Sequence, residues 1–594
     1  LTSRFVGCVR CVYGTALDGP HCASDKHVSR SVRRRHLRRD RWTHWANDGI
    51  HSVNVLSGRG AHAAKGSPCP AASEQVALDI GNTYRGLGPP PTDLLPPDGA
   101  LRELLNKTGY YNADRPDLGS YVKDNVSWPA VGSTPMQLVA GLAEADRARL
   151  NDWERLMLRD PAEAAEIRHR AGLRRPHCDK DLFKNPRVYG DFLNRLADAG
   201  MVRFEPAGRR EGVLGVFFVV KKSGQLRVIF DTRVLNSQFI DPPRTQLPSA
   251  AALSGVEIQA GEPLYLASGD ISNAFYGMAI PHSLGSRFTL PTVRASYIEA
   301  QHLSGVDLPA GEAVIPCLTI LPMGWSWSLH YCQCVVSRCM QSVLEPGAMI
   351  VDKTAGVRLA GSRAADSRAA EKPPDDQGLV IAAGAGYVDN FCLMSTRQSF
   401  ANKKIEEAKA AMIEMGLVVH EMTAASRDAE FVGLDLHDGV WSVKTKRLWR
   451  LRRAIEAVLA RGRISGRALE VLLGHVTWSV MVKREGLAIM DQVYTHIQAH
   501  YEEHAPISRA VRTELFQIMI VLTLLRAHTS ASWHSRITMS DASSFGIGIV
   551  DVGSSPEAVG AIGRCSEKWR YHTQGCIAAR RSALGTEPVQ SDST

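Results

Sequence analysis

Two aspartates stand where a folded chain would present a carboxylate at the end of a strand. Asp389 lies in residues 386–394, where apolar residues flank a polar Asp389-Asn390 pair; this pattern predicts a β-hairpin with the carboxylate at its tip. Asp270 ends the strand-like run 264–270, and the aromatic pair Phe275-Tyr276 follows. Mg²⁺ prefers carboxylate oxygens, so the two residues predict a metal site if their strands are neighbours. Most Asp-Asn turns are only turns, so the hairpin alone does not decide this.

A third segment lies between the other two and supplies their context. Residues 321–333 begin with a Pro-x-Gly turn and open into a helix that carries Gln333. In this order the three segments resemble the palm of reverse transcriptases. The shared motifs are a strand ending in Asp with an aromatic after it, Leu-Pro-x-Gly-x-x-x-Ser with a Gln further on, and Tyr-x-Asp-Asp. The resemblance is to retrotransposon enzymes of the long-terminal-repeat or tyrosine-recombinase type.

This resemblance implies an α+β fold, the right-hand polymerase with fingers, palm and a helical thumb. It also implies an RNA-directed DNA polymerase, which adds nucleotides from dNTPs to a primer 3′-end on an RNA or DNA template. Two Mg²⁺ or Mn²⁺ ions would serve this reaction. By resemblance, Asp270 and Asp389 bridge the ions, and the backbone carbonyl of Ile271 is a further ligand.

Asn390 departs from the family pattern, which usually has a second Asp at this position. An asparagine keeps one oxygen ligand but loses a charge, which predicts a weaker metal site. Two interpretations therefore stay open: an active polymerase, or a degraded retroelement relic that only binds nucleic acid. A third, an RNA-directed RNA polymerase, is disfavoured by Phe275.

A second predicted hairpin carries positive charge. The apolar strand-like stretch 213–220 and a second stretch, 225–231, flank the turn Lys221-Lys222-Ser223-Gly224. The segment resembles the fingers hairpin of reverse transcriptases, in which Lys221 or Lys222 with Arg227 would neutralise the nucleotide triphosphate. The alternative is an ordinary Lys-Ser-Gly surface turn.

The resemblance assigns further residues to nucleotide and template binding. Phe275 stands where the family places a ring against the sugar 2′-carbon, which predicts a preference for dNTPs over rNTPs; plain core packing is the alternative. Met323 and Gly324 would line the nucleotide pocket, and Gln333 would contact the template strand. His420 is a candidate for the general acid that protonates pyrophosphate, because the family's Lys is missing after Gly416-Leu417.

The chain divides into four predicted parts. Residues 1–150 form an unassigned basic and Pro-rich region, expected to be partly disordered. Fingers and palm are expected over 151–440, with a surface insertion at about 349–378. A helical thumb or connection is expected over 441–530, and a truncated segment over 531–594. Cys8, Cys11, His21, Cys22 and His27 match the spacing of neither a zinc finger nor a retroviral knuckle, so no zinc site is predicted there.

The last part resembles the first hairpin of a ribonuclease H domain. Asp541 lies in the first predicted strand and would be a metal ligand, while Arg581 stands where that family needs a Glu. Only 53 residues follow Asp541, about half of what that fold requires, so ribonuclease H activity is not expected.

Composition adds the remaining expectations. The net charge is +9, from 70 Lys+Arg against 61 Asp+Glu, which suits a polyanionic partner. No apolar run reaches the roughly 20 residues of a membrane span, so no membrane partner is expected. Twelve scattered cysteines indicate a reduced, intracellular protein of the cytoplasm or nucleus. The first residue, Leu1, predicts that the chain is a fragment or a mature piece, and nothing indicates an oligomeric state.

Overall fold

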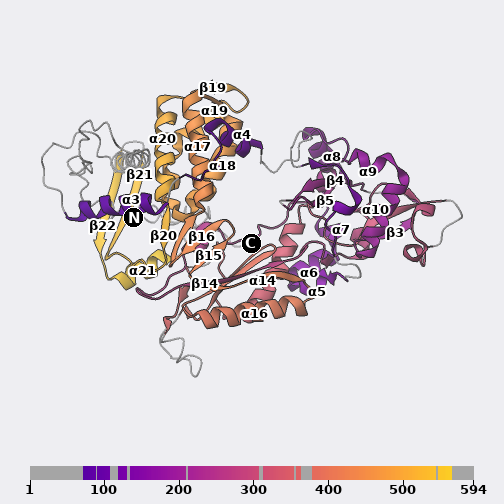
Figure 1. The fold of residues 1–594 in the computed structure, drawn as a ribbon, viewed down its shortest axis with the longest axis horizontal. Coiled ribbons are helices and arrows are strands. Elements are labelled where there is room, and N and C mark those ends of the chain that lie inside the picture. Colours follow the sequence, from indigo (N-terminus) through magenta and orange to yellow (C-terminus); the bar gives the residue numbers. More distant parts are fainter. Residues whose placement is uncertain are drawn as a thin grey trace, which may run out of the picture.

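The computed structural model describes residues 71–87, 90–106, 118–129, 134–208, 212–221, 223–306, 312–352, 356–362, 378–543 and 546–564. The predictions for Lys222, Arg581 and Cys8–His27 fall outside these residues. Helices and sheets are mixed along the chain, as the α+β prediction requires, and they form several lobes (Figure 1). None of the helices in the described part of the chain is long and apolar enough to cross a membrane.

A four-stranded antiparallel sheet lies at the centre of the molecule. Its order is β12 (Ala383–Tyr387), β13 (Asn390–Ser395), β6 (Tyr265–Ile271) and β14 (Val419–Ser426). Helices α14 (Ser328–Val343) and α16 (Gln398–Glu414) pack together beside it (Figure 1). Successive strand residues point to opposite faces. Ala267, Ile271 and Leu393 therefore join the core on the helix side, whereas Leu266 and Met394 join a second core on the other side.

A second lobe contains the predicted basic hairpin. Strands β4 (Gly215–Val220) and β5 (Leu226–Asp231) form this hairpin, and β1 (Leu118–Gly119) pairs with β4. A further sheet contains β3 (Val202–Pro206), β9 (Ala313–Leu318) and β8 (Val293–Arg294). Helix α10 (Pro186–Asp198) packs against β3 and β8. The other helices of this half are α5 (Leu138–Gly141), α6 (Glu144–Asn151), α7 (Trp153–Leu156), α8 (Pro161–Arg170), α9 (Lys180–Lys184), α11 (Arg233–Asn236) and α13 (His282–Gly285).

A third lobe is a bundle of helices on a small sheet. Its helices are α17 (Thr445–Arg461), α18 (Gly466–Val480), α19 (Asp491–Ala499) and α20 (Arg509–Val521). Its sheet has the order β15 (Asp428–Phe431), β16 (Leu434–His437), β17 (Val440–Val443) and β20 (Arg526–His528).

A helix from the unassigned N-terminal region completes this bundle. Helix α4 (Pro97–Asn106) packs against α17 (Figure 1). Two ion pairs accompany the packing: Arg450 with Glu103 at 3.1 Å and Arg461 with Asp98 at 2.9 Å. Within the described part of residues 1–150, α4 thus belongs to this bundle, whereas α5 and α6 lie beside helix α14.

The C-terminal segment contains the predicted hairpin. Strand β21 (Arg536–Ser543) pairs with β22 (Gly546–Gly553), and Asp541 is opposite Gly548 in the register. Helix α21 (Pro556–Arg564) follows. Part of the predicted insertion is ordered by pairing, since β10 (Arg358–Leu359) runs parallel to β11 (Leu379–Val380).

Gly269 lets three strands of the central sheet approach one another. A Cβ at this buried position would overlap the ring of Phe391 on β13 and lie 2.8 Å from Met422 Sδ on β14. We expect Gly269→Ala to lower the free energy of unfolding by about 1–3 kcal/mol, because the packed sheet cannot expand without strain. Chemical denaturation measures this.

Gly474, exposed on helix α18, is the matched control, since a Cβ there meets nothing within 4 Å. Gly474→Ala should raise stability by up to about 1 kcal/mol. An equal effect of both substitutions would contradict the packing described here.

Candidate active site

The hairpin of β12 and β13 presents Asp389 at its tip. Tyr387 pairs with Asn390, so the turn consists of Val388 and Asp389. The position of Asp389 is as predicted, but Asn390 is the first residue of β13 and not part of the turn. Val388 has a φ of +60°, a conformation that β-branched residues rarely adopt. The turn therefore depends on support from its surroundings.

Asp270 lies directly beside this tip. In the pairing of β13 with β6, Asn390 is opposite Asp270, so both side chains are on the same face of the sheet. The Ile271 N–H donates a hydrogen bond to the Asp389 carbonyl oxygen at 2.8 Å. The Asn390 Nδ2 donates to Asp389 Oδ1 at 2.9 Å. The structure thus brings together the three residues that the sequence placed at the centre of the chemistry.

The surroundings of Asp270 change its ionisation. Partial burial raises the pKa of Asp270 to about 6, and the negative charge of Asp389 is the second cause of the rise. Glu421 raises this pKa further, while His420 and Arg227 lower it. Without a cation, Asp270 is therefore about half protonated at pH 6, and a bound divalent ion would favour its ionised form.

Strand β14 contributes two residues next to Asp270. Its pairing with β6 is irregular, because Val419 is opposite Ile271 whereas Glu421 is opposite Asp270, which leaves His420 as the extra residue of a bulge. His420 Nδ1 lies 3.4 Å from Asp270 Oδ1, and its Nε2 lies 3.5 Å from Glu421 Oε1. Glu421 was not among the site residues predicted from the sequence. The run Val419-His420-Glu421 predicts a strand. The bulge that turns Glu421 toward Asp270 depends on the pairing with β6, so it cannot be predicted from this run alone.

Gln333 on α14 supports the β12–β13 hairpin through two hydrogen bonds to its backbone. It is buried; its Nε2 donates to the Gly386 carbonyl at 2.8 Å, and its Oε1 accepts from the Val388 N–H at 2.8 Å. The Cys332 thiol adds a weak bond to the Val388 carbonyl at 3.7 Å. The template contact predicted for Gln333 is not available in this arrangement, because both ends of its amide are committed to the strained turn.

The aromatic pair after Asp270 divides into two roles. Tyr276 is buried, and its hydroxyl donates to the Val228 carbonyl of β5 at 2.7 Å. Phe275 packs against the same core but is partly exposed. Phe275 therefore keeps a surface that a ligand can reach, whereas Tyr276 fixes this turn to the basic hairpin.

The Pro-x-Gly turn meets the end of the basic hairpin. Gly324 has a φ of +110°, and a Cβ there would lie 3.1 Å from Thr232 Oγ1. Its carbonyl accepts a hydrogen bond from Asn236 Nδ2 at 2.9 Å. Gly324 is exposed and Met323 is partly exposed, so both remain accessible at the positions predicted for a nucleotide pocket.

The cations of the basic hairpin differ in availability. Lys221 Nζ donates to Ser127 Oγ at 2.7 Å, and burial followed by repulsion from Arg227 lowers its pKa. Arg227 is exposed on β5, and its positive charge lowers the pKa of Asp270. Of the two, Arg227 is the better placed to meet a phosphate near the carboxylates.

The donor set fits hard divalent cations. Asp270 and Asp389 supply carboxylate oxygens, and Asn390 and Glu421 supply further oxygens on the same strand ends. Asp270 and Glu421 face each other across the β6–β14 pairing beside the Asp389 tip, and burial together with these negative charges raises the pKa of Asp270; a cation here would offset both. The predicted Ile271 carbonyl ligand follows Asp270 directly in the chain, and its coordination stays a prediction.

Comparison with known proteins assigns neither a family nor an activity to this chain, so both rest on the geometry of the site. No protein-family model and no curated protein matches the chain. A solved structure of a foamy viral protease–reverse transcriptase in complex with double-stranded DNA is similar, with a TM-score of 0.41 and 15% sequence identity. The match covers 77% of this chain and 66% of that chain, just under two thirds of its length. A similarity of this size assigns neither a family nor an activity.

Gln333→Leu tests the support of the hairpin. The substitution leaves the Val388 N–H and the Gly386 carbonyl buried without their partner, so the free energy of unfolding should fall by about 2–4 kcal/mol. Denaturant unfolding measures this, with Gln341→Leu, exposed on the same helix, as the matched control. Equal stability of the two variants would show that the amide does not carry the turn.

Asp270→Asn tests the electrostatic strain of the site. A folded-state pKa of about 6 lies above the ordinary value, so the stability that protonation of Asp270 contributes is lost as the pH rises through 6. An asparagine at this position does not ionise, so its contribution to stability does not change as the pH rises through 6. In the absence of divalent ions, the variant should therefore melt about 1–2 °C higher than wild type at pH 8.

The rise in melting temperature caused by Asp270→Asn should be smaller at pH 4.5, where wild-type Asp270 is largely protonated. Thermal unfolding at both pH values measures the difference, with the exposed Glu414→Gln as control. A gain that does not depend on pH would contradict the raised pKa.

Proposed function

We propose that this chain is an RNA-directed DNA polymerase of a retroelement, which transfers nucleotides from dNTPs to a primer 3′-end with the help of two Mg²⁺ ions. One observation carries the proposal: the β6–β13 register sets Asp270 opposite Asn390, the residue that follows Asp389 at the hairpin tip, and the Ile271 N–H donates to the Asp389 carbonyl oxygen. This is the arrangement that two-metal nucleotidyl transfer requires from carboxylates of separate strands.

The lobes around the sheet fit a right-hand polymerase. The central sheet with α14 and α16 would be the palm, the β4–β5 lobe the fingers, and the bundle α17–α20 the thumb (Figure 1). The hairpin β15–β16 turns at Val432 and Gly433, both with positive φ, and β15 contacts β6 of the central sheet. In the proposed enzyme this hairpin would grip the primer end. A template–primer duplex and dNTPs are the partners that this arrangement would hold, and an intracellular location accords with them.

Each site residue would have a role in nucleotide transfer that follows from its side-chain chemistry. Asp270 and Asp389 would hold the ions, which supply Lewis-acid stabilisation to the attacking 3′-oxygen and the leaving pyrophosphate. Arg227 would neutralise the triphosphate from the facing hairpin, assisted by Lys221 and Lys222. Phe275, through its exposed edge, would exclude a ribose 2′-hydroxyl. His420, in contact with Asp270, is a candidate proton donor.

Glu421 bears on whether the site is complete. Asn390 removes one charge from the usual set, but Glu421 lies opposite Asp270 on the other neighbouring strand. We infer that Glu421 restores part of the missing negative charge, which favours an active enzyme. The β21–β22 hairpin with Asp541 would be a remnant of a ribonuclease H domain, with no activity assigned to it.

The second candidate function is nucleic-acid binding without catalysis, and Asn390 is the observation that favours it. Primer extension on an RNA template with Mg²⁺ or Mn²⁺ separates the two. For an active enzyme we expect incorporation of dNTPs in preference to rNTPs, a loss of at least about 100-fold in Asp389→Asn, and a higher rate in Asn390→Asp.

Glu414→Gln, exposed on α16, is the control for a surface carboxylate. No incorporation by the wild type, together with retained salt-sensitive binding of primer–template, would leave only the binding function. Ready use of rNTPs would instead indicate an RNA-directed RNA polymerase.

A further inference from the structure

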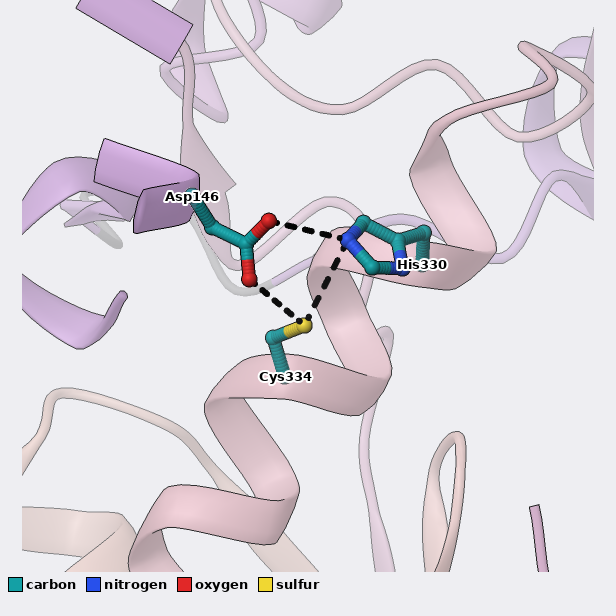
Figure 2. Close-up of side chains that lie close together, drawn as sticks. All are labelled: Asp146, His330 and Cys334. Atoms are coloured by element: carbon teal, nitrogen blue, oxygen red, sulfur yellow. Dashed lines mark hydrogen bonds and ion pairs between the residues drawn. The ribbon is translucent and has the colours of Figure 1, made fainter. Parts of the chain in front are cut away.

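Three side chains of metal-ligating types converge on the flank of helix α14. Asp146 comes from α6, and His330 and Cys334 come from successive turns of α14 (Figure 2). His330 Nε2 lies 3.2 Å from Asp146 Oδ1 and 3.7 Å from Cys334 Sγ, and Cys334 Sγ lies 3.5 Å from Asp146 Oδ2. The spacing of four residues puts both α14 ligands on one face of the helix.

The contacts share a single imidazole nitrogen. A nucleophilic Cys-His-Asp arrangement would use both ring nitrogens, one for the thiol and the other for the carboxylate. Here Nε2 faces both groups, and Nδ1 instead lies 3.4 Å from Thr245 Oγ1. One ring nitrogen, one sulfur and one carboxylate thus face one another, with ligand atoms within 4.8 Å, as the ligands of a coordinated ion do.

The distances also match the size of one particular class of ion. With Zn–S bonds of about 2.3 Å and Zn–N and Zn–O bonds of about 2.0–2.1 Å, tetrahedral ligands lie about 3.3–3.6 Å from one another. The three observed separations, from 3.2 to 3.7 Å, lie within about 0.1 Å of this range, with Asp146 Oδ1 facing His330 and Oδ2 facing Cys334. Magnesium does not suit the set, because it prefers oxygen ligands and avoids thiolate.

The surroundings orient the three ligands. His330 is buried, its ring lies edge-on to Trp327, and a proton on Nδ1 shared with Thr245 would leave the Nε2 lone pair free. Arg149 pairs with Asp146 Oδ1 at 2.8 Å. A carboxylate accepts several partners, so Arg149 can keep this bond as an outer partner while the other lone pairs bind an ion.

We propose that Asp146, His330 and Cys334 form a zinc site, with a water molecule in the fourth position, that ties helix α6 to helix α14. Zn²⁺ binding converts the Cys334 thiol to a thiolate and releases its proton to solvent. Because α14 also supports the Asp389 hairpin through Gln333, the ion would stiffen the helix on which the candidate active site depends. The zinc site itself does not depend on the polymerase proposal.

The test is the metal content of the full-length chain. After dialysis against a weak chelator, mass spectrometry should find about one zinc ion per chain in the wild type and in Cys339→Ser, a buried cysteine of the same helix. Cys334→Ser and His330→Gln should lose it. A triple Cys8→Ser, Cys11→Ser, Cys22→Ser variant should keep it. Zinc retained in Cys334→Ser and His330→Gln, or lost only in the triple variant, would overturn the proposal.

A measurement on the wild type removes any dependence on variants that fold poorly. Added Zn²⁺ should slow the alkylation of Cys334 at least about tenfold, while Mg²⁺ should not, and Cys178 serves as the internal reference. Co²⁺ should give the thiolate-to-cobalt charge-transfer band of a tetrahedral site. Alkylation of Cys334 at the same rate with and without Zn²⁺, and no such band, would show that the cluster is a hydrogen-bond network.

Discussion

The antiparallel pairing of β6 with β13 is the constraint on which the site depends. It sets Asp270 opposite Asn390 and next to the Asp389 tip, although the two strands are far apart along the chain. Because side chains alternate, a slip of one residue would turn Asp270 to the face covered by α14 and α16. The buried residues on both faces of β6 and the close approach at Gly269 fix this register. The fold thereby holds together two carboxylates that repel each other.

Helix α14 is the second support of the site. Gln333 satisfies the backbone of a turn in which Val388 adopts an unfavourable conformation, and Cys332 contacts the same residue. Two other side chains of this helix, His330 and Cys334, meet Asp146 from an N-terminal helix. One helix thus connects the strained tip to the body of the protein, which is how a local strain persists at a functional site.

Local pattern was enough to predict the elements that carry the candidate chemistry. The basic hairpin, the strand that ends in Asp270 and the hairpin with Asp389 at its tip all follow from alternation and turn residues. The outcomes that differed depend on tertiary contacts. Gln333 was expected to face a template, but a buried strained turn needs its amide. Asn390 was expected in the turn, but it pairs with Tyr387.

Other features of the structure, which depend on contacts between distant segments, could not be predicted from the sequence. Glu421 comes next to Asp270 through a bulge, and a bulge is a mismatch between two strands that neither sequence shows alone. Helix α4 lies before the predicted palm in the chain but packs on α17, and the Asp146 cluster likewise joins distant segments. Short amphipathic helices do not specify which surface they cover.

The most direct test is the binding of Mn²⁺ to wild type, Asp270→Asn, Asp389→Asn and the double variant, followed by electron paramagnetic resonance. If both carboxylates hold the same ions, each single substitution should weaken binding by about tenfold or more, and the double variant should lose much less than the sum of the two free-energy changes. Strictly additive losses, or Mn²⁺ affinity unchanged in either single variant, would contradict a shared site for Asp270 and Asp389.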